Sequence, residues 1–216
     1  MIDMNTEPSN SIHDEQLFTP LLKKIELVLV ILSAASIVLK LLHASFAGSL
    51  VIVSFSSLSF FYLARAMYLG GGRLLFFQRQ NPNISFTRKM TTYVSGFAIS
   101  LTCIGVIFKF QFWQGSRSQI LIGVLSGALA VVLTMFLSRK TGLSIYRQLL
   151  TRVTIFFAIG VMLFLTTDAR LLDIVHPGND PEKAAFKKYL EHPEDPQAQK
   201  EWEEAQHEMD SIRNLK

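Results

Sequence analysis

Long apolar stretches, separated by short polar loops, dominate the pattern along this chain. Five of them approach the roughly 20 residues that an α-helix needs to cross the ~30 Å hydrocarbon layer of a bilayer. They carry no continuous polar stripe, which is typical of helices that contact lipid rather than water. The pattern therefore predicts five membrane-spanning helices, at residues 25–42, 48–69, 90–108, 118–137 and 149–167.

These spans divide the chain into three parts and predict an all-α, multi-pass transmembrane bundle. A polar N-terminal segment (1–24) precedes the transmembrane domain (25–176), and an acidic helical tail (177–216) follows. We expect the fifth span to leave the membrane without a break and to end near His176, before Pro177-Gly178. In the tail, the pairs Asp180-Pro181 and Asp195-Pro196 predict helix starts, and hence helices at 181–191 and 196–213.

Charged residues are few and unevenly distributed. They make up 18% of the sequence, against 50% hydrophobic residues, and no Asp or Glu lies between Leu27 and Thr167. From Asp168 onward, twelve acidic and seven basic residues give a net charge of −5, whereas the preceding part carries +9. Because this positive charge lies between apolar spans, nucleic-acid binding is excluded as an interpretation.

The positions of Lys and Arg predict the orientation in a bacterial cytoplasmic (inner) membrane. Basic residues precede the first span and are frequent in the second and fourth loops. The first loop has none, and the third has only Arg117. With five spans, the N-terminus is cytoplasmic and the C-terminal tail periplasmic; with four, the tail is cytoplasmic. The second loop also mixes basic and aromatic residues, as expected for contact with anionic lipid headgroups.

An internal repeat links two parts of the transmembrane domain. Residues 37–54 and 106–123 align without gaps at an offset of 69, which places Lys40 opposite Lys109. Each copy is predicted to be a helical hairpin with the lysine near its turn. Two spans separate the copies, so both hairpins should point the same way, as in a parallel repeat.

Lys40 and Lys109 are the main candidate functional residues within the spans. Each lysine either extends its ammonium group to the membrane surface or pairs with a carboxylate of the tail or of another chain. His43 lies on the same helical face as Lys40 and is either a titrating group or an ordinary interfacial residue. Trp113, with Phe112, is expected to be an interfacial anchor.

The two predicted turns resemble a known family. Leu39-Lys40-Leu-Leu-His43 and Phe108-Lys109-Phe-Gln-Phe-Trp113-Gln-Gly115 are similar to the N-terminal membrane hairpin of the gliding-motility L protein. That family supplies the stator of the gliding and type IX secretion motor, in which several copies surround a single-span partner and use the proton-motive force. The family has a glutamate in the returning helix, and this chain has none there. The resemblance therefore implies a relative that lacks the proton-carrying acid.

The tail and the remaining residue types narrow the classes of function. Trp202, Ala205, Met209 and Ile212 form one apolar stripe, which either packs within the tail or docks a partner. The single Cys103 and scattered histidines predict no disulfide, metal site or cofactor. An enzyme is the least favoured class, with acids at the membrane edge, for instance Asp168 with Asp173, as candidate catalytic groups.

The favoured interpretation is therefore an assembly or interaction component that lies in the lipid bilayer. Its expected partners are further copies of itself or a single-span membrane protein. The alternative is a small secondary transporter built from the parallel hairpin repeat.

Overall fold

The structure is a computed structural model that describes residues 9–42, 44, 46–69, 73–74, 77–78, 86–141, 144–175, 181–192 and 194–213. Five long helices form a bundle: α1 (Ser9–Leu41), α2 (Ala47–Leu69), α3 (Phe86–Phe110), α4 (Ser116–Thr141) and α5 (Ser144–Leu165). Three shorter helices follow: α6 (Asp168–Val175), α7 (Pro181–Glu191) and α8 (Pro196–Arg213). The predicted all-α bundle is confirmed. A two-residue antiparallel ladder between β1 (Arg73–Leu74) and β2 (Phe77–Gln78) was not predicted.

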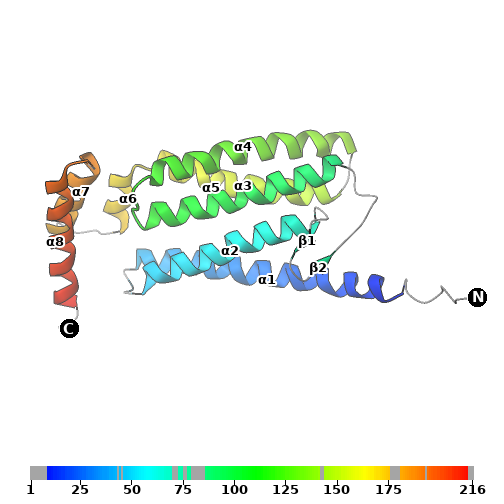
Figure 1. The fold of residues 1–216 in the computed structure, drawn as a ribbon, viewed down its shortest axis with the longest axis horizontal. Helices are drawn as coiled ribbons and strands as arrows, with labels where there is room; N and C mark the ends of the chain where they lie inside the picture. Colours follow the sequence, from blue (N-terminus) through cyan, green and yellow to red (C-terminus); the bar gives the residue numbers. More distant parts are fainter. Residues whose placement is uncertain are drawn as a thin grey trace, which may run out of the picture.

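The long helices run in alternating directions, with α3 at the centre of the bundle (Figure 1). α3 packs against α2, α4 and α5, whereas α1 packs along α2 at the edge. The turns of the α1–α2 and α3–α4 hairpins lie at the same end, beside α6, α7 and α8 (Figure 1). We call this end the tail end and the other the loop end. The two hairpins thus point the same way, as the repeat predicts.

Four helices in the described part of the chain are long and apolar enough to cross a membrane. They are α2, α3, α4 and α5, which contain the second, third and fourth predicted spans and all but the last two residues of the fifth. α1 contains the first predicted span except its last residue but is not one of the four. Charged residues, including Glu26 and Lys40, interrupt its apolar run near both ends. Membrane crossing by α1 therefore stays a prediction.

The helix boundaries confirm the predicted tail helices and correct the predictions for the N-terminal segment and the fifth span. α7 and α8 have the predicted bounds. α1 begins at Ser9, so much of the predicted polar segment is already helical. The prediction that the fifth span continues as one helix to about His176 is wrong, because α5 ends at Leu165 and α6 starts at Asp168. The cause is local: Thr167 Oγ1 accepts a hydrogen bond from the Arg170 backbone N–H at 3.3 Å and so caps a new helix.

Small and hydroxyl-bearing residues join the helices of the bundle. Ser36 bonds to Ser54 across α1 and α2 at 3.0 Å, and Ser59 bonds to Ser100 across α2 and α3 at 2.6 Å. A side chain at Gly96 would meet the backbone of α2, since an added Cβ would lie 2.9 Å from the Tyr62 carbonyl oxygen. Close approach through small residues and paired hydroxyls is how helices associate in lipid.

Candidate functional sites at the two ends of the bundle

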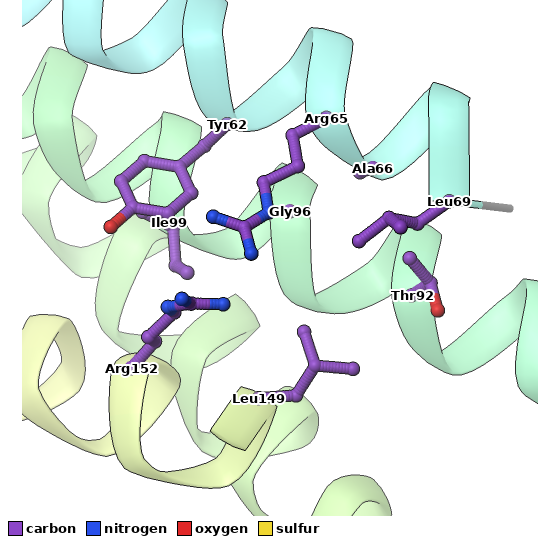
Figure 2. A pocket seen from close by; sticks show the side chains of 9 residues that line it. All are labelled: Tyr62, Arg65, Ala66, Leu69, Thr92, Gly96, Ile99, Leu149 and Arg152. Atoms are coloured by element: carbon purple, nitrogen blue, oxygen red, sulfur yellow. The ribbon is translucent and has the colours of Figure 1, made fainter. Parts of the chain in front are cut away.

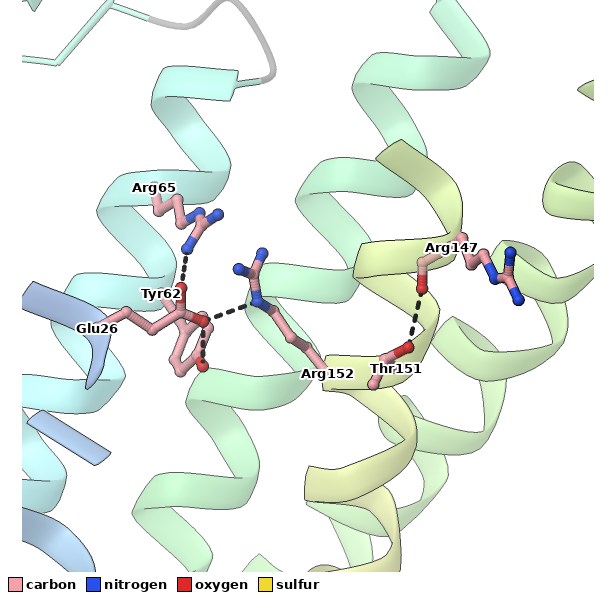
Figure 3. Close-up of polar contacts among 6 residues, drawn as sticks. All are labelled: Glu26, Tyr62, Arg65, Arg147, Thr151 and Arg152. Carbon is pink, nitrogen blue, oxygen red and sulfur yellow. Dashed lines mark hydrogen bonds and ion pairs between the residues drawn. The ribbon is translucent and has the colours of Figure 1, made fainter. Parts of the chain in front are cut away.

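A buried carboxylate joins three helices near the loop end. Glu26 of α1 accepts a hydrogen bond on Oε1 from the Tyr62 hydroxyl of α2 at 2.9 Å. The same oxygen lies 2.8 Å from Arg152 Nε of α5, and Oε2 is paired with the Arg65 guanidinium of α2. Figure 3 shows these four side chains converging. We call Glu26, Tyr62, Arg65 and Arg152 the loop-end cluster.

The loop-end cluster is poorly solvated and has an excess of positive charge. The side chains of Glu26 and Arg65 are 11% and 12% exposed, and that of Arg152 is 22% exposed. Two guanidinium groups share one carboxylate, so with the glutamate ionised the cluster carries a net charge of +1. Removing one member of such a network leaves another charge buried and unpaired, which is costly. The cluster therefore fixes α1 and α5 against α2.

A small pocket adjoins this cluster between α2, α3 and α5 (Figure 2). Its volume is about 20 Å³, and Tyr62, Arg65 and Arg152 line it together with apolar and small residues. Figure 2 shows the guanidinium groups of both arginines directed into it. Gly96 forms part of its wall, so the close approach of α2 and α3 also shapes the pocket.

Sequence reasoning did not identify the loop-end cluster. In the sequence, Glu26 lies at the start of the first predicted span, Arg65 near the end of the second and Arg152 near the start of the fifth. Their meeting depends on α1 packing along α2 while α5 packs against α3, an arrangement that the pattern of a single sequence does not specify. The available signal was one acid and two arginines at corresponding depths in three apolar helices.

A second charge pair lies at the tail end. Lys109 Nζ of α3 is 2.6 Å from Asp168 Oδ1 of α6, and the lysine side chain is only 3% exposed. The Ser116 hydroxyl donates to the same oxygen at 3.5 Å, a long hydrogen bond. Of the two alternatives for Lys109, the structure shows pairing with a carboxylate rather than an ammonium group at the surface, and that carboxylate lies on α6, just before the tail.

Lys40, the repeat partner of Lys109, has different surroundings. Its side chain is half-buried, and Gln111 of the other hairpin turn donates a 2.7 Å hydrogen bond to the Gly48 carbonyl oxygen. A Cβ added at Gly48 would lie 3.5 Å from both Lys40 Nζ and Gln111 Oε1. Lys40 is therefore next to the contact between the two hairpin turns. His43 lies outside the described residues.

Aromatic residues attach the tail to the bundle. Trp113 is 45% exposed and its ring meets Phe108 edge-on, at a centroid distance of 5.1 Å. Phe112, with a φ of 54°, packs on Phe186 of α7 at 5.2 Å. In the tail, Trp202 of α8 stacks on Tyr189 at 5.1 Å. Trp202 thus packs within the tail. The side chains of Met209 and Ile212 are outside the described part.

The two acids considered for catalysis are both paired with lysines. Asp168 is bound by Lys109, as above, and Asp173 Oδ1 of α6 lies 2.6 Å from Lys183 Nζ of α7. The hydrogen bond from Lys183 lowers the pKa of the Asp173 carboxyl below its usual value. Within the described residues, no three His, Cys, Asp or Glu side chains gather as a metal site would require.

Comparison of the chain with protein-family models, with curated proteins and with solved structures gave no match. The comparisons therefore assign this chain to no family. The helical bundle with four apolar helices indicates a membrane protein.

Proposed function

We propose that this chain is a non-enzymatic assembly or interaction component of the bacterial cytoplasmic membrane, related to the stators of gliding and type IX secretion motors. In this proposal α1 also crosses the membrane, which makes five spans in all, so the N-terminus is cytoplasmic and the tail is periplasmic. The observation that carries it is a bundle in which serine hydroxyls pair between helices and in which a buried charge pair or cluster lies at each end. Such a bundle suits a scaffold that holds partners in place.

The packing favours a scaffold over a transporter. A transport path needs polar groups that face water or substrate in at least one state. Here the hydroxyls of Ser59 and Ser100, and those of Ser95 and Thr134, bond to each other between helices. Gly123 brings α4 against the α3 backbone, since an added Cβ would lie 3.1 Å from Thr102 Cα. These contacts fill the space that a substrate would use.

The alternative, a small secondary transporter, is favoured by two observations. The loop-end cluster and the Lys109–Asp168 pair lie near opposite ends of the bundle, where the gates of an alternating-access transporter would lie. The parallel arrangement of the two hairpins is also found among transporters (Figure 1).

The native mass and composition of the full-length protein, purified in mild detergent, test the proposal. Several copies together with a single-span partner would support it. A monomer or dimer without a co-purifying protein would overturn it and leave the transporter as the better hypothesis. Lys40→Gln, with Arg117→Gln as the control at the same end, adds a second readout. If the protein couples ion movement to work, Lys40→Gln should abolish that activity while the complex still assembles, and Arg117→Gln should not. If the protein is an assembly component, the two variants should form the complex to the same extent and show no difference in activity.

A further inference from the structure

The pocket beside the loop-end cluster combines features that point to an anion. Glu26 balances only one of the two guanidinium groups that reach it. Arg152 contacts Glu26 through Nε, so its two terminal nitrogens are directed away from the carboxylate (Figure 3). Arg65 and Arg152 are both lining residues of the pocket, and their guanidinium groups are turned towards it (Figure 2). Planar guanidinium groups bind phosphate oxygens through paired, charge-assisted hydrogen bonds.

The position and walls of the pocket narrow the choice of anion. It lies between three helices near the loop end, where the sequence predicts the basic, cytoplasmic loops. Leu69 and Leu149 add apolar surface beside the arginines. Basic pockets between transmembrane helices on the cytoplasmic side are typical binding places for phosphate headgroups.

The size of the pocket sets a further limit. Its volume of about 20 Å³ is far below the roughly 300–1,000 Å³ of pockets that enclose whole organic ligands. A site this small takes one water molecule or one oxygen atom of an oxyanion whose remainder stays outside. A phosphate group at the mouth of the pocket, with one oxygen directed towards the arginines, meets this limit.

We propose that Arg65 and Arg152 bind a phosphate anion in this pocket, as the headgroup of an anionic phospholipid or as free phosphate. Bound phosphate neutralises the excess positive charge of the loop-end cluster and joins α2 to α5. Glu26 competes with the anion for the same two arginines, because it already pairs with both of them.

The test uses the full-length protein, stripped of lipid in detergent, and native mass spectrometry with phosphatidylglycerol or phosphatidylcholine. We expect Arg152→Gln to weaken phosphatidylglycerol binding by about tenfold or more, the effect of losing a charge-assisted hydrogen bond. Arg147→Gln is the matched control, since Arg147 lies on the same helix, is exposed and points away from the cluster (Figure 3). Arg147→Gln should bind phosphatidylglycerol with an affinity within about twofold of that of the unaltered protein.

Glu26→Gln separates binding from a merely structural role. It keeps both arginines and removes their competitor, so we expect phosphatidylglycerol to bind as tightly or more tightly. The proposal is overturned if Arg152→Gln and Arg147→Gln bind phosphatidylglycerol with the same affinity, or if Glu26→Gln binds it as poorly as Arg152→Gln. It is also overturned if phosphatidylglycerol binds no better than phosphatidylcholine and free phosphate does not bind. Thermal stabilisation by inorganic phosphate without lipid, lost in Arg152→Gln, assigns the site to free phosphate. Retention of phosphatidylglycerol alone assigns it to a headgroup.

Discussion

The Lys109–Asp168 pair predicts an unequal response to the loss of either partner. The lysine side chain is 3% exposed and the aspartate side chain 25% exposed. Asp168→Asn leaves an ammonium group buried without a carboxylate, and breaking a buried pair in this way costs about 3 kcal/mol or more. Lys109→Met keeps the apolar stem and leaves a carboxylate that water can reach, so we expect a loss of about 1 kcal/mol.

The measurement is the free energy of unfolding in mixed micelles, followed by circular dichroism as the fraction of denaturing detergent rises. The double variant should lose about as much as Lys109→Met alone, because no unpaired buried charge remains. Lys188→Met is the control: its pair with Glu201 is exposed on both sides, at 47% and 40%, and its loss should cost about 0.5 kcal/mol or less. A larger loss in Lys109→Met than in Asp168→Asn, or losses that add in the double variant, would refute the reasoning.

Three further predictions follow from contacts described above. Gly96→Ala should destabilise the bundle by about 2 kcal/mol or more in the same assay, because the new Cβ would lie 2.9 Å from the Tyr62 carbonyl oxygen; an unchanged stability would mean that α2 and α3 separate easily. Trp202→Ala should speed proteolysis of the tail between α7 and α8 while the unfolding of the bundle stays the same, since its aromatic contacts lie within the tail. The carboxyl NMR signal of Asp173 should titrate at a lower pH than in Lys183→Gln, and equal midpoints would contradict the ion pair. Because folding lowers this pKa, the stabilisation is present above the ordinary Asp value of about 3.9 and is lost as the pH falls through the lowered value.

The sequence was sufficient for the features that depend on residues near one another in the chain. Apolar runs of about 20 residues gave four of the helices that can cross a membrane, and Asp-Pro pairs gave the starts of both tail helices. The break between α5 and α6 was missed because apolar periodicity continues across it. The deciding contact is the hydroxyl cap supplied by Thr167, which competes with continuation of the helix.

Features that depend on how the helices are arranged were harder to predict. The absence of acids in the central spans limited the partner of Lys109 to the C-terminal part of this chain or to another chain, and the partner in the structure is Asp168 of α6. The loop-end cluster had no comparable constraint. Glu26 lies only two residues beyond Lys24 and resembled a charge at the membrane edge. Its burial follows from α1 packing along α2, a pairing of faces that depends on shape and not on periodicity.

The central position of α3 has a consequence for the order in which the protein is made and inserted. α3 is the most enclosed of the four apolar helices, and α4, which follows it, is the most apolar. A helix with Lys109 and several hydroxyls gains little from lipid alone, so it is best held by α4 as the hairpin enters the bilayer. The partner of Lys109 is synthesised only after α5. Until Asp168 has left the ribosome, the buried ammonium group of Lys109 at the tail end of the bundle has no carboxylate, so synthesis of α6 is the step that pairs this charge and completes the bundle.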